Sequence, residues 1–260
     1  MIHNIGNNIK NSVDDIKQSI LLFACTPNDV SLIPLNISIN NNGEEISIER
    51  FSDICLLLQE MGAENINLVT PSHYIPLIRE GLIMAKRKGL IIPIVYNTSG
   101  YEKVSSLKLL DGLVDIYLPD FKYYDKELNK YSNINNYFEI TREALKEMYR
   151  QVGRPVIKKG IMKRGVIVRH LVLPSHIEDS KKVIKYLFDN YGNNIYLSIM
   201  NQYTPIRRCK YLELNNRVSE EEYDEIIDYA YDLGVRKCFV QDKESQEESF
   251  IPVFKGDSVI

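Results

Sequence analysis

Charged side chains that could bind a small polar ligand follow two of the apolar runs in this sequence. Asp120 and Lys122 alternate after the run DIYLP, so their side chains face the same side of an extended segment. Arg169 and His170 are adjacent within the run GVIVRHLVL, so they face opposite sides, and one of them should point toward the binding face. Arg169 there could hold a carboxylate through two parallel N–H bonds, whereas a lone histidine is more often structural. A salt-bridged loop could also require the Asp120 and Lys122 spacing, so both interpretations are open.

Smaller polar residues follow three further apolar runs. They form the segments TPSHY (70 to 74), NTSGY (97 to 101) and MNQYTP (200 to 205). The NTSG loop offers hydroxyl and amide groups suited to a ribose or an amino-acid head group, although ordinary turns have the same composition. For His73 at a helix start and His176 in a loop, the sequence favours capping or solvent-facing roles.

The spacing of the cysteines argues against a metal site. Cys25, Cys55, Cys209 and Cys238 lie far apart in the sequence, and none belongs to a CxxC pair or a Cys/His cluster. We interpret Cys55, in the helical pattern FSDICLLLQEM, and Cys238 as structural thiols.

The segment that begins at Cys25 reads CTPNDVSLIPLNIS. A CxxxCxxC loop laid over it would need thiolates at Asp29 and Leu32. Asp offers a hard oxygen and Leu offers no ligand, so this segment cannot supply three soft sulfur ligands to iron.

The elements that must position these side chains alternate along the chain. Strands are predicted at 19–24, 66–70, 91–97, 115–119, 165–173, 194–200 and 237–241. Helices are predicted at 48–62, 73–89, 101–112, 138–153, 178–192 and 219–234. Ser219 with Glu222 forms a capping-box pattern, and glycines stand where helices stop, at Gly62, Gly89, Gly153, Gly192 and Gly234. Continuous apolar strands that alternate with helices favour an α/β barrel with its site at the carboxyl ends of the strands, and a doubly wound sheet is the alternative.

Composition limits the classes of partner. The chain has 260 residues, 44% hydrophobic residues, 26% charged residues and a net charge of −3. This balance gives no electrostatic bias toward nucleic acid or a membrane surface, so we expect a protein or small-molecule partner. The start, MIHNIGNNIKNSVDD, lacks the apolar core of a signal peptide, which predicts a cytoplasmic protein. We expect a single domain over 1–260, with a short N-terminal extension at 1–17.

These segments, taken in order, resemble the radical SAM proteins similar to pyruvate formate-lyase-activating enzyme. The matching segments are INLVTPSHY, IPIVYNTSGYE, VDIYLPDFKYYD, VIVRHLVLPSHIEDS, YLSIMNQYTP and FVQ. The resemblance covers the chain from about residue 19 and implies a partial (β/α)6 barrel. In that family a CxxxCxxC loop holds a 4Fe-4S cluster that binds S-adenosylmethionine and generates a radical that abstracts hydrogen from a substrate.

Residue by residue, the resemblance implies a set of cofactor-binding positions for S-adenosylmethionine. They are Thr70, Pro71, Asn97, Ser99, Asp120, Lys122, Arg169 and, approximately, Tyr203. The cluster loop departs from the family, because Cys25 is left as a remnant ligand while Asn36, Ile37 and Ser38 stay in register.

Three hypotheses follow from this pattern. The first is a radical SAM fold that has lost its cluster and binds S-adenosylmethionine or a partner without catalysis. The second is an active radical SAM enzyme, as the family resemblance implies, that abstracts hydrogen from a protein or small-molecule substrate. The third is an unrelated barrel enzyme that uses Lys122, Asp120 and Arg169 for acid–base or carbonyl chemistry. The sequence does not assign a catalytic residue in any of them.

Overall fold

The computed structural model describes residues 22–23, 46–205 and 210–240. Cys25, Asp29, Leu32 and Cys209 lie outside the described residues, as does the segment that holds Asn36, Ile37 and Ser38. None of the described helices is both long and apolar enough to cross a membrane.

One sheet organises the described part of the chain. Its strands are β1 (Leu22–Phe23), β2 (Ile66–Val69), β3 (Ile94–Thr98), β4 (Ile116–Pro119), β5 (Val156–Lys158), β6 (Ile161–Leu171), β7 (Tyr196–Met200) and β8 (Cys238–Val240). Seven strands pair in parallel in the order β1-β2-β3-β4-β6-β7-β8. A doubly wound sheet reverses its strand order at a switch point, and this order does not reverse. Among the described strands, β1 and β8 are the two edges of the sheet, and they do not pair with each other. The fold is therefore a partial α/β barrel.

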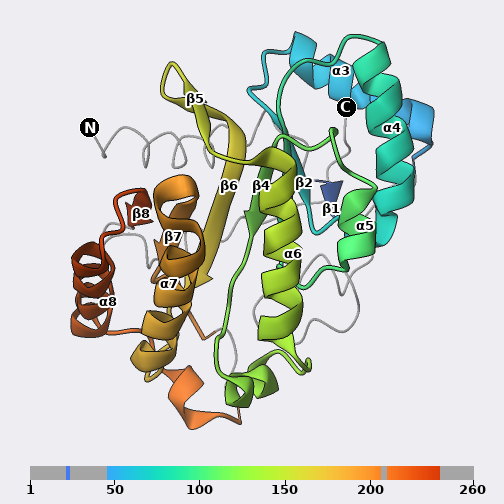
Figure 1. Ribbon diagram of the computed structural model, residues 1–260. Coiled ribbons are helices and arrows are strands. Elements are labelled where there is room, and N and C mark those ends of the chain that lie inside the picture. Colours follow the sequence, from blue (N-terminus) through green and yellow to red (C-terminus); the bar gives the residue numbers. More distant parts are fainter. Residues whose placement is uncertain (1–21, 24–45, 206–209, 241–260) are drawn as a thin grey trace.

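Helices connect the strands and cover one side of the sheet. They are α3 (Ile48–Glu60), α4 (Ile75–Arg87), α5 (Val104–Lys108), α6 (Tyr137–Val152), α7 (Ile177–Tyr191) and α8 (Glu220–Leu233). Short 3₁₀ turns are η2 (Ser72–Tyr74), η3 (Lys126–Tyr131), η4 (Gly192–Asn194) and η5 (Leu212–Asn215). In Figure 1, α6 and α7 lie in front of the strands, and β4 and β6 point down toward η3 and η5. All six predicted helices are present, and the predicted capping box of Ser219 and Glu222 begins α8.

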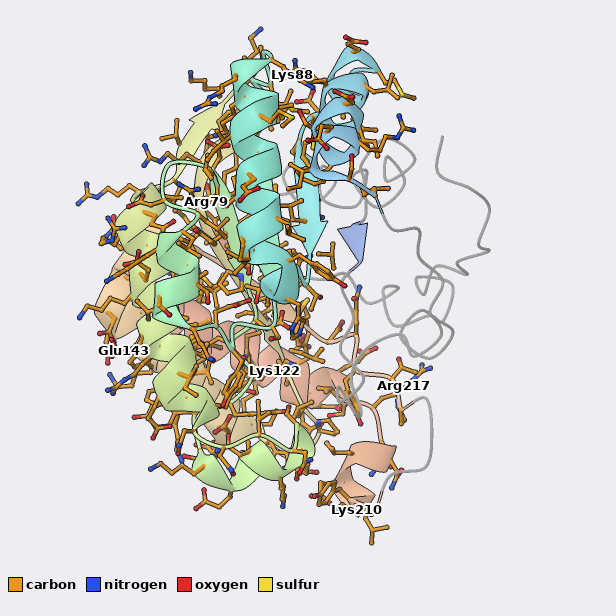
Figure 2. All side chains as sticks on the ribbon, turned by 90° about the vertical axis from the view of Figure 1, so that its right-hand side faces the viewer. Arg79, Lys88, Lys122, Glu143, Lys210 and Arg217 are labelled. Atoms are coloured by element: carbon orange, nitrogen blue, oxygen red, sulfur yellow. The ribbon has the colours of Figure 1, made fainter. Side chains whose placement is uncertain are left out.

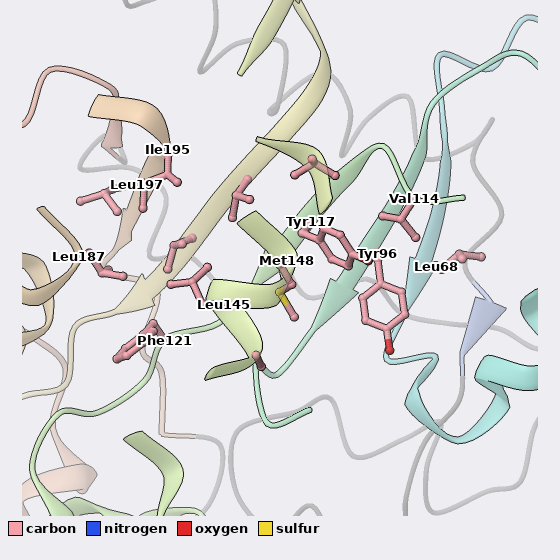
Figure 3. Packing of buried hydrophobic residues seen from close by; sticks show 14 of the residues in the cluster. Leu68, Tyr96, Val114, Tyr117, Phe121, Leu145, Met148, Leu187, Ile195 and Leu197 are labelled. Carbon is pink, nitrogen blue, oxygen red and sulfur yellow. The ribbon is translucent and has the colours of Figure 1, made fainter. Parts of the chain in front are cut away.

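The hydrophobic core lies between the sheet and these helices. Tyr96 of β3 and Tyr117 of β4 are fully buried, with ring centroids 5.7 Å apart. Figure 3 shows the two rings in one buried cluster with Leu145 and Met148 of α6, which are also fully buried. Burying such side chains contributes about 1.5–3 kcal/mol each, so this layer fixes how the strands and their ends are arranged.

Strand β5 was not predicted from the sequence. It forms an antiparallel hairpin with the start of β6, and the prediction began that strand at residue 165. The turn residues Lys159 and Gly160 both have positive φ, of 51° and 82°, as the central residues of a type I′ turn do. All three β5 residues are exposed. An exposed hairpin lacks the continuous apolar run on which the strand prediction relied, and this explains the omission.

Candidate functional site

A cavity of about 280 Å³ lies at the carboxyl ends of the parallel strands. Six of the eight predicted cofactor-binding residues line it: Thr70, Asn97, Ser99, Asp120, Lys122 and Arg169. They come from the ends of β2, β3, β4 and β6, where a barrel of parallel strands gathers its functional groups. The remaining lining residues are Val69, Thr98, Tyr123, Leu171, Leu173 and Met200.

Two predicted residues are outside the lining of the cavity. Pro71 precedes η2, directly after Thr70. Tyr203 is buried, and its hydroxyl donates to the Leu214 carbonyl oxygen at 2.7 Å. At the end of β7, Met200 contributes to the cavity wall instead.

Asp120 and Arg169 form an ion pair inside the cavity. Arg169 Nη2 lies 2.6 Å from Asp120 Oδ1, and the two residues are also joined by a backbone bridge. The Arg169 side chain is 27% exposed and the Asp120 side chain is 23% exposed, so the pair is partly shielded from water. This contact ties the end of β4 to β6 across the cavity wall.

Lys122 is the second cation of the cavity. Its side chain is half-buried and forms no ion pair with any residue in the described ranges. Figure 2 shows it near the centre of the view, with Lys88 near the top and Lys210 near the bottom. Because Asp120 balances Arg169, Lys122 gives the described lining of the cavity an excess positive charge, which favours a ligand that carries an anionic group.

The structure decides how Arg169 and His170 are oriented. Arg169 lines the cavity, whereas His170 lies on the core side of β6 with Val166 and Val168. The His170 ring is hydrogen-bonded through Nδ1 to the Phe121 carbonyl oxygen, at a distance of 2.8 Å. Burial lowers the pKa of His170 to about 4, so the ring is neutral near pH 7 and Nδ1 is the donor. His170 therefore has a structural position.

This burial predicts that stability depends on pH through His170. The folded pKa of about 4 lies below the unfolded value of about 6.5, so the unfolded state binds more protons as pH falls. The stability that neutral His170 contributes to the folded state is fully present above about pH 6.5 and is lost as pH falls toward 4. Between about pH 7.5 and pH 5 the free energy of unfolding should fall by about 2 kcal/mol on this account.

Urea unfolding of the wild type and of His170→Asn at both pH values isolates this effect. The Asn amide can still donate to the Phe121 carbonyl oxygen but does not titrate. Other groups contribute equally to both proteins, among them Asp179, whose pKa burial raises to about 6. If the free energy of unfolding of the variant depended on pH as that of the wild type does, His170 would not be the cause of the dependence.

Glu102 joins the cavity-side ends of β2 and β3. It is only 4% exposed, and its Oε1 accepts hydrogen bonds from the hydroxyls of Ser72, Tyr96 and Thr98. Ser72 lies two residues after Thr70, and the φ of 50° at Thr70 is unusual for a β-branched residue. Strain of this kind costs about 1–3 kcal/mol and persists only where the surroundings hold it.

The Tyr137 hydroxyl joins the ends of β3 and β4. It lies 2.9 Å from the Ser99 carbonyl oxygen and 3.1 Å from the Asp120 carbonyl oxygen, and it accepts a hydrogen bond from the Lys122 backbone N–H at 3.1 Å. The side chain is fully buried at the start of α6. Burial raises the pKa of Tyr137 well above its ordinary value, so the hydroxyl keeps its proton.

Sequence reasoning missed both Glu102 and Tyr137. Glu102 lies in the segment NTSGYE and could have been noticed as a carboxylate that follows a turn of small polar residues. Tyr137 gives no comparable signal, because its partners are 38, 17 and 15 residues away along the chain.

A larger cavity of about 440 Å³ lies beside the start of α7. Its carboxylates are largely engaged within the fold. Asp125 pairs with Lys182 at 2.6 Å, and Glu178 pairs with Lys181 at 2.8 Å. Asp179 accepts hydrogen bonds from the backbone N–H groups of Tyr124 and Asp125. The smaller cavity, whose Lys122 forms no ion pair with any residue that the structure describes, is therefore the better candidate for a binding site.

Comparison with known proteins supports the fold. No protein-family model matches the sequence. The structure resembles a domain of pyruvate-formate lyase-activating enzyme from Bacteroides vulgatus, with a TM-score of 0.51 and 12% identity over 69% of this chain and 100% of that one. It also resembles methylornithine synthase, with a TM-score of 0.51 and 12% identity over 92% of this chain and 77% of that one. The chain shares the fold of these two structures, which is a radical SAM-like fold.

A sequence relative extends this comparison. An uncharacterized protein of Methanocaldococcus jannaschii is 30% identical over 175 residues, which cover 65% of this chain. The chain spans 46% of the length of that relative. The radical SAM fold confirms the predicted partial barrel, and it leaves the chemistry to be argued from the chain's own residues.

Proposed function

We propose that this radical SAM-like chain binds S-adenosylmethionine or a partner without catalysing radical chemistry. The observation that carries the proposal is the gathering of six predicted ligand-binding residues in one cavity. The second part rests on the sequence, where Asp29 and Leu32 stand at the positions that a CxxxCxxC loop needs for cysteines.

The cavity suits the amino-acid end of S-adenosylmethionine. Lys122 could pair with the ligand carboxylate, Asp120 could accept from its ammonium group, and Asn97 offers an amide. The volume of about 280 Å³ lies just below the range of roughly 300–1,000 Å³ for ligand pockets. The described walls therefore match the head group better than the whole molecule.

The described donors do not fit an iron–sulfur cluster. No group of three or more His, Cys, Asp or Glu residues in the described ranges is placed to hold a metal ion. Burial raises the pKa values of Cys55 and Cys238 to about 12, which keeps both thiols protonated. Iron binds the thiolate, so neither thiol is a suitable ligand.

The other hypotheses have less support. An active radical SAM enzyme would need cluster ligands that the described residues do not supply. A barrel enzyme that uses Asp120 as a free base conflicts with the ion pair of Asp120 and Arg169. A protein or small-molecule partner, a cytoplasmic location and a single domain stay predictions from the sequence.

Calorimetric titration of iron-free protein with S-adenosylmethionine tests the proposal. Binding should be present and should be unchanged by a chelator. Lys122→Met should raise Kd about tenfold or more, because a hydrogen bond to a charged group is worth about 1.5–3 kcal/mol. Lys126→Met is the matched control, since Lys126 is exposed and pairs with Glu139 at 3.2 Å. Absence of binding by the wild type would contradict the proposed binding of S-adenosylmethionine.

A further inference from the structure

We propose that Tyr137 is a positioning residue that works with Glu102 to hold the ligand-binding loops in place before any ligand arrives. The inference rests on the proposed binding of S-adenosylmethionine. Neither residue lines the cavity. Both act on the loops that carry the lining residues.

Glu102 fixes the first junction through three hydroxyl groups. Ser72 is in η2 after β2, and Tyr96 and Thr98 belong to β3. Because one carboxylate oxygen accepts from both sides, the loop after β2 cannot move from β3 without leaving a buried carboxylate short of donors.

Tyr137 fixes the second junction. A phenol has one hydrogen to donate and can also accept, so the Ser99 and Asp120 carbonyl oxygens share its donor while the Lys122 N–H uses its oxygen. The contacts are backbone contacts, so they set the paths of the loops that carry Ser99, Asp120 and Lys122. Tyr137 is fully buried, so water cannot take the place of the hydroxyl readily.

Together the two residues connect three consecutive loops of the cavity. All of these hydrogen bonds lie within the described residues and involve none of the residues 24–45, where the cluster motif would stand. These particular contacts therefore hold the described loops of the cavity without using a group from that segment. Removing the Tyr137 hydroxyl should reduce the fraction of molecules in the binding-competent state, and the apparent Kd rises by the inverse of that fraction.

Tyr137→Phe and Tyr117→Phe form a matched pair for the test. Each loses one hydroxyl from a fully buried tyrosine, and the Tyr117 hydroxyl donates to Gln151 on the helix side of the sheet. We expect similar shifts in the urea midpoint for both variants. Only Tyr137→Phe should weaken binding of S-adenosylmethionine, by about tenfold. Equal affinities for the two variants would overturn the inference, because a general loss of stability would affect both alike.

Amide hydrogen exchange tests the inference separately from ligand binding. In Tyr137→Phe without ligand, the Lys122 amide should exchange at least about tenfold faster, while amides of β7 keep their protection. Unchanged protection at Lys122 would overturn the inference. If wild-type protein does not bind S-adenosylmethionine, the proposed function fails while the exchange result still decides the positioning role. If Tyr137→Phe does not fold, Ser72→Ala tests the first junction through a roughly threefold loss of affinity, and unchanged affinity there counts against the inference.

Discussion

The double variant Asp29→Cys/Leu32→Cys should bind about four iron atoms per chain after anaerobic reconstitution with iron and sulfide, whereas the wild type should bind almost none. The variant creates CxxxCxxC from Cys25 onward, in the segment where the sequence resemblance aligns Asn36, Ile37 and Ser38 with the radical SAM proteins. Three thiolates can hold a cluster and leave one iron open, while a carboxylate and a leucine cannot replace two of them. Iron and sulfide analysis with visible absorption measures the result.

Cys25→Ala in the background of this double variant is the control. It removes one of the three cysteine ligands and should abolish the cluster. Loss of iron in this variant would show that the two introduced thiols do not hold iron nonspecifically. A wild-type chain that binds about four iron atoms would contradict the proposed loss of the cluster and favour an active radical enzyme.

Gly100→Ala should lower the free energy of unfolding by about 3 kcal/mol and the Tm by roughly 10 °C. Gly100 has a φ of +81°, and a Cβ added there would lie 2.1 Å from the Asp120 carbonyl oxygen. The neighbouring atom is backbone and is tied to Tyr137, so it cannot move aside cheaply. Positive φ costs an alanine about 1 kcal/mol, and overpacking adds about 1–3 kcal/mol.

Gly112→Ala separates the two contributions to this loss. Gly112 has a similar φ of +76°, but a Cβ there would meet no atom within 4 Å. Its substitution should therefore cost only the conformational part, about 1 kcal/mol. Urea unfolding of both variants measures the difference, and equal losses would show that the approach of Gly100 to Asp120 is not constraining.

The order of the elements and most of the residues that reach the site could be predicted from the sequence alone. Apolar runs that alternate with amphipathic segments predicted the parallel strands and all six helices, and Ser219 with Glu222 marked the start of α8. In a parallel barrel every strand ends at the same edge, so residues that directly follow strands, such as Asn97 and Lys122, meet in space. The sequence was sufficient for these features because each strand, helix and strand end is marked by the residues within it or next to it.

Only the tertiary structure decided which side chains face the cavity and what holds them there. Alternation along β6 places Arg169 and His170 on opposite sides, but it does not say which side the helices cover. That choice depends on the packing of the α6 and α7 side of the sheet, and it makes Arg169 a cavity residue and His170 a core residue. The contacts of Tyr137 also needed the fold, because they are hydrogen bonds to backbone groups, and the sequence carries no mark of which carbonyl a distant phenol will reach.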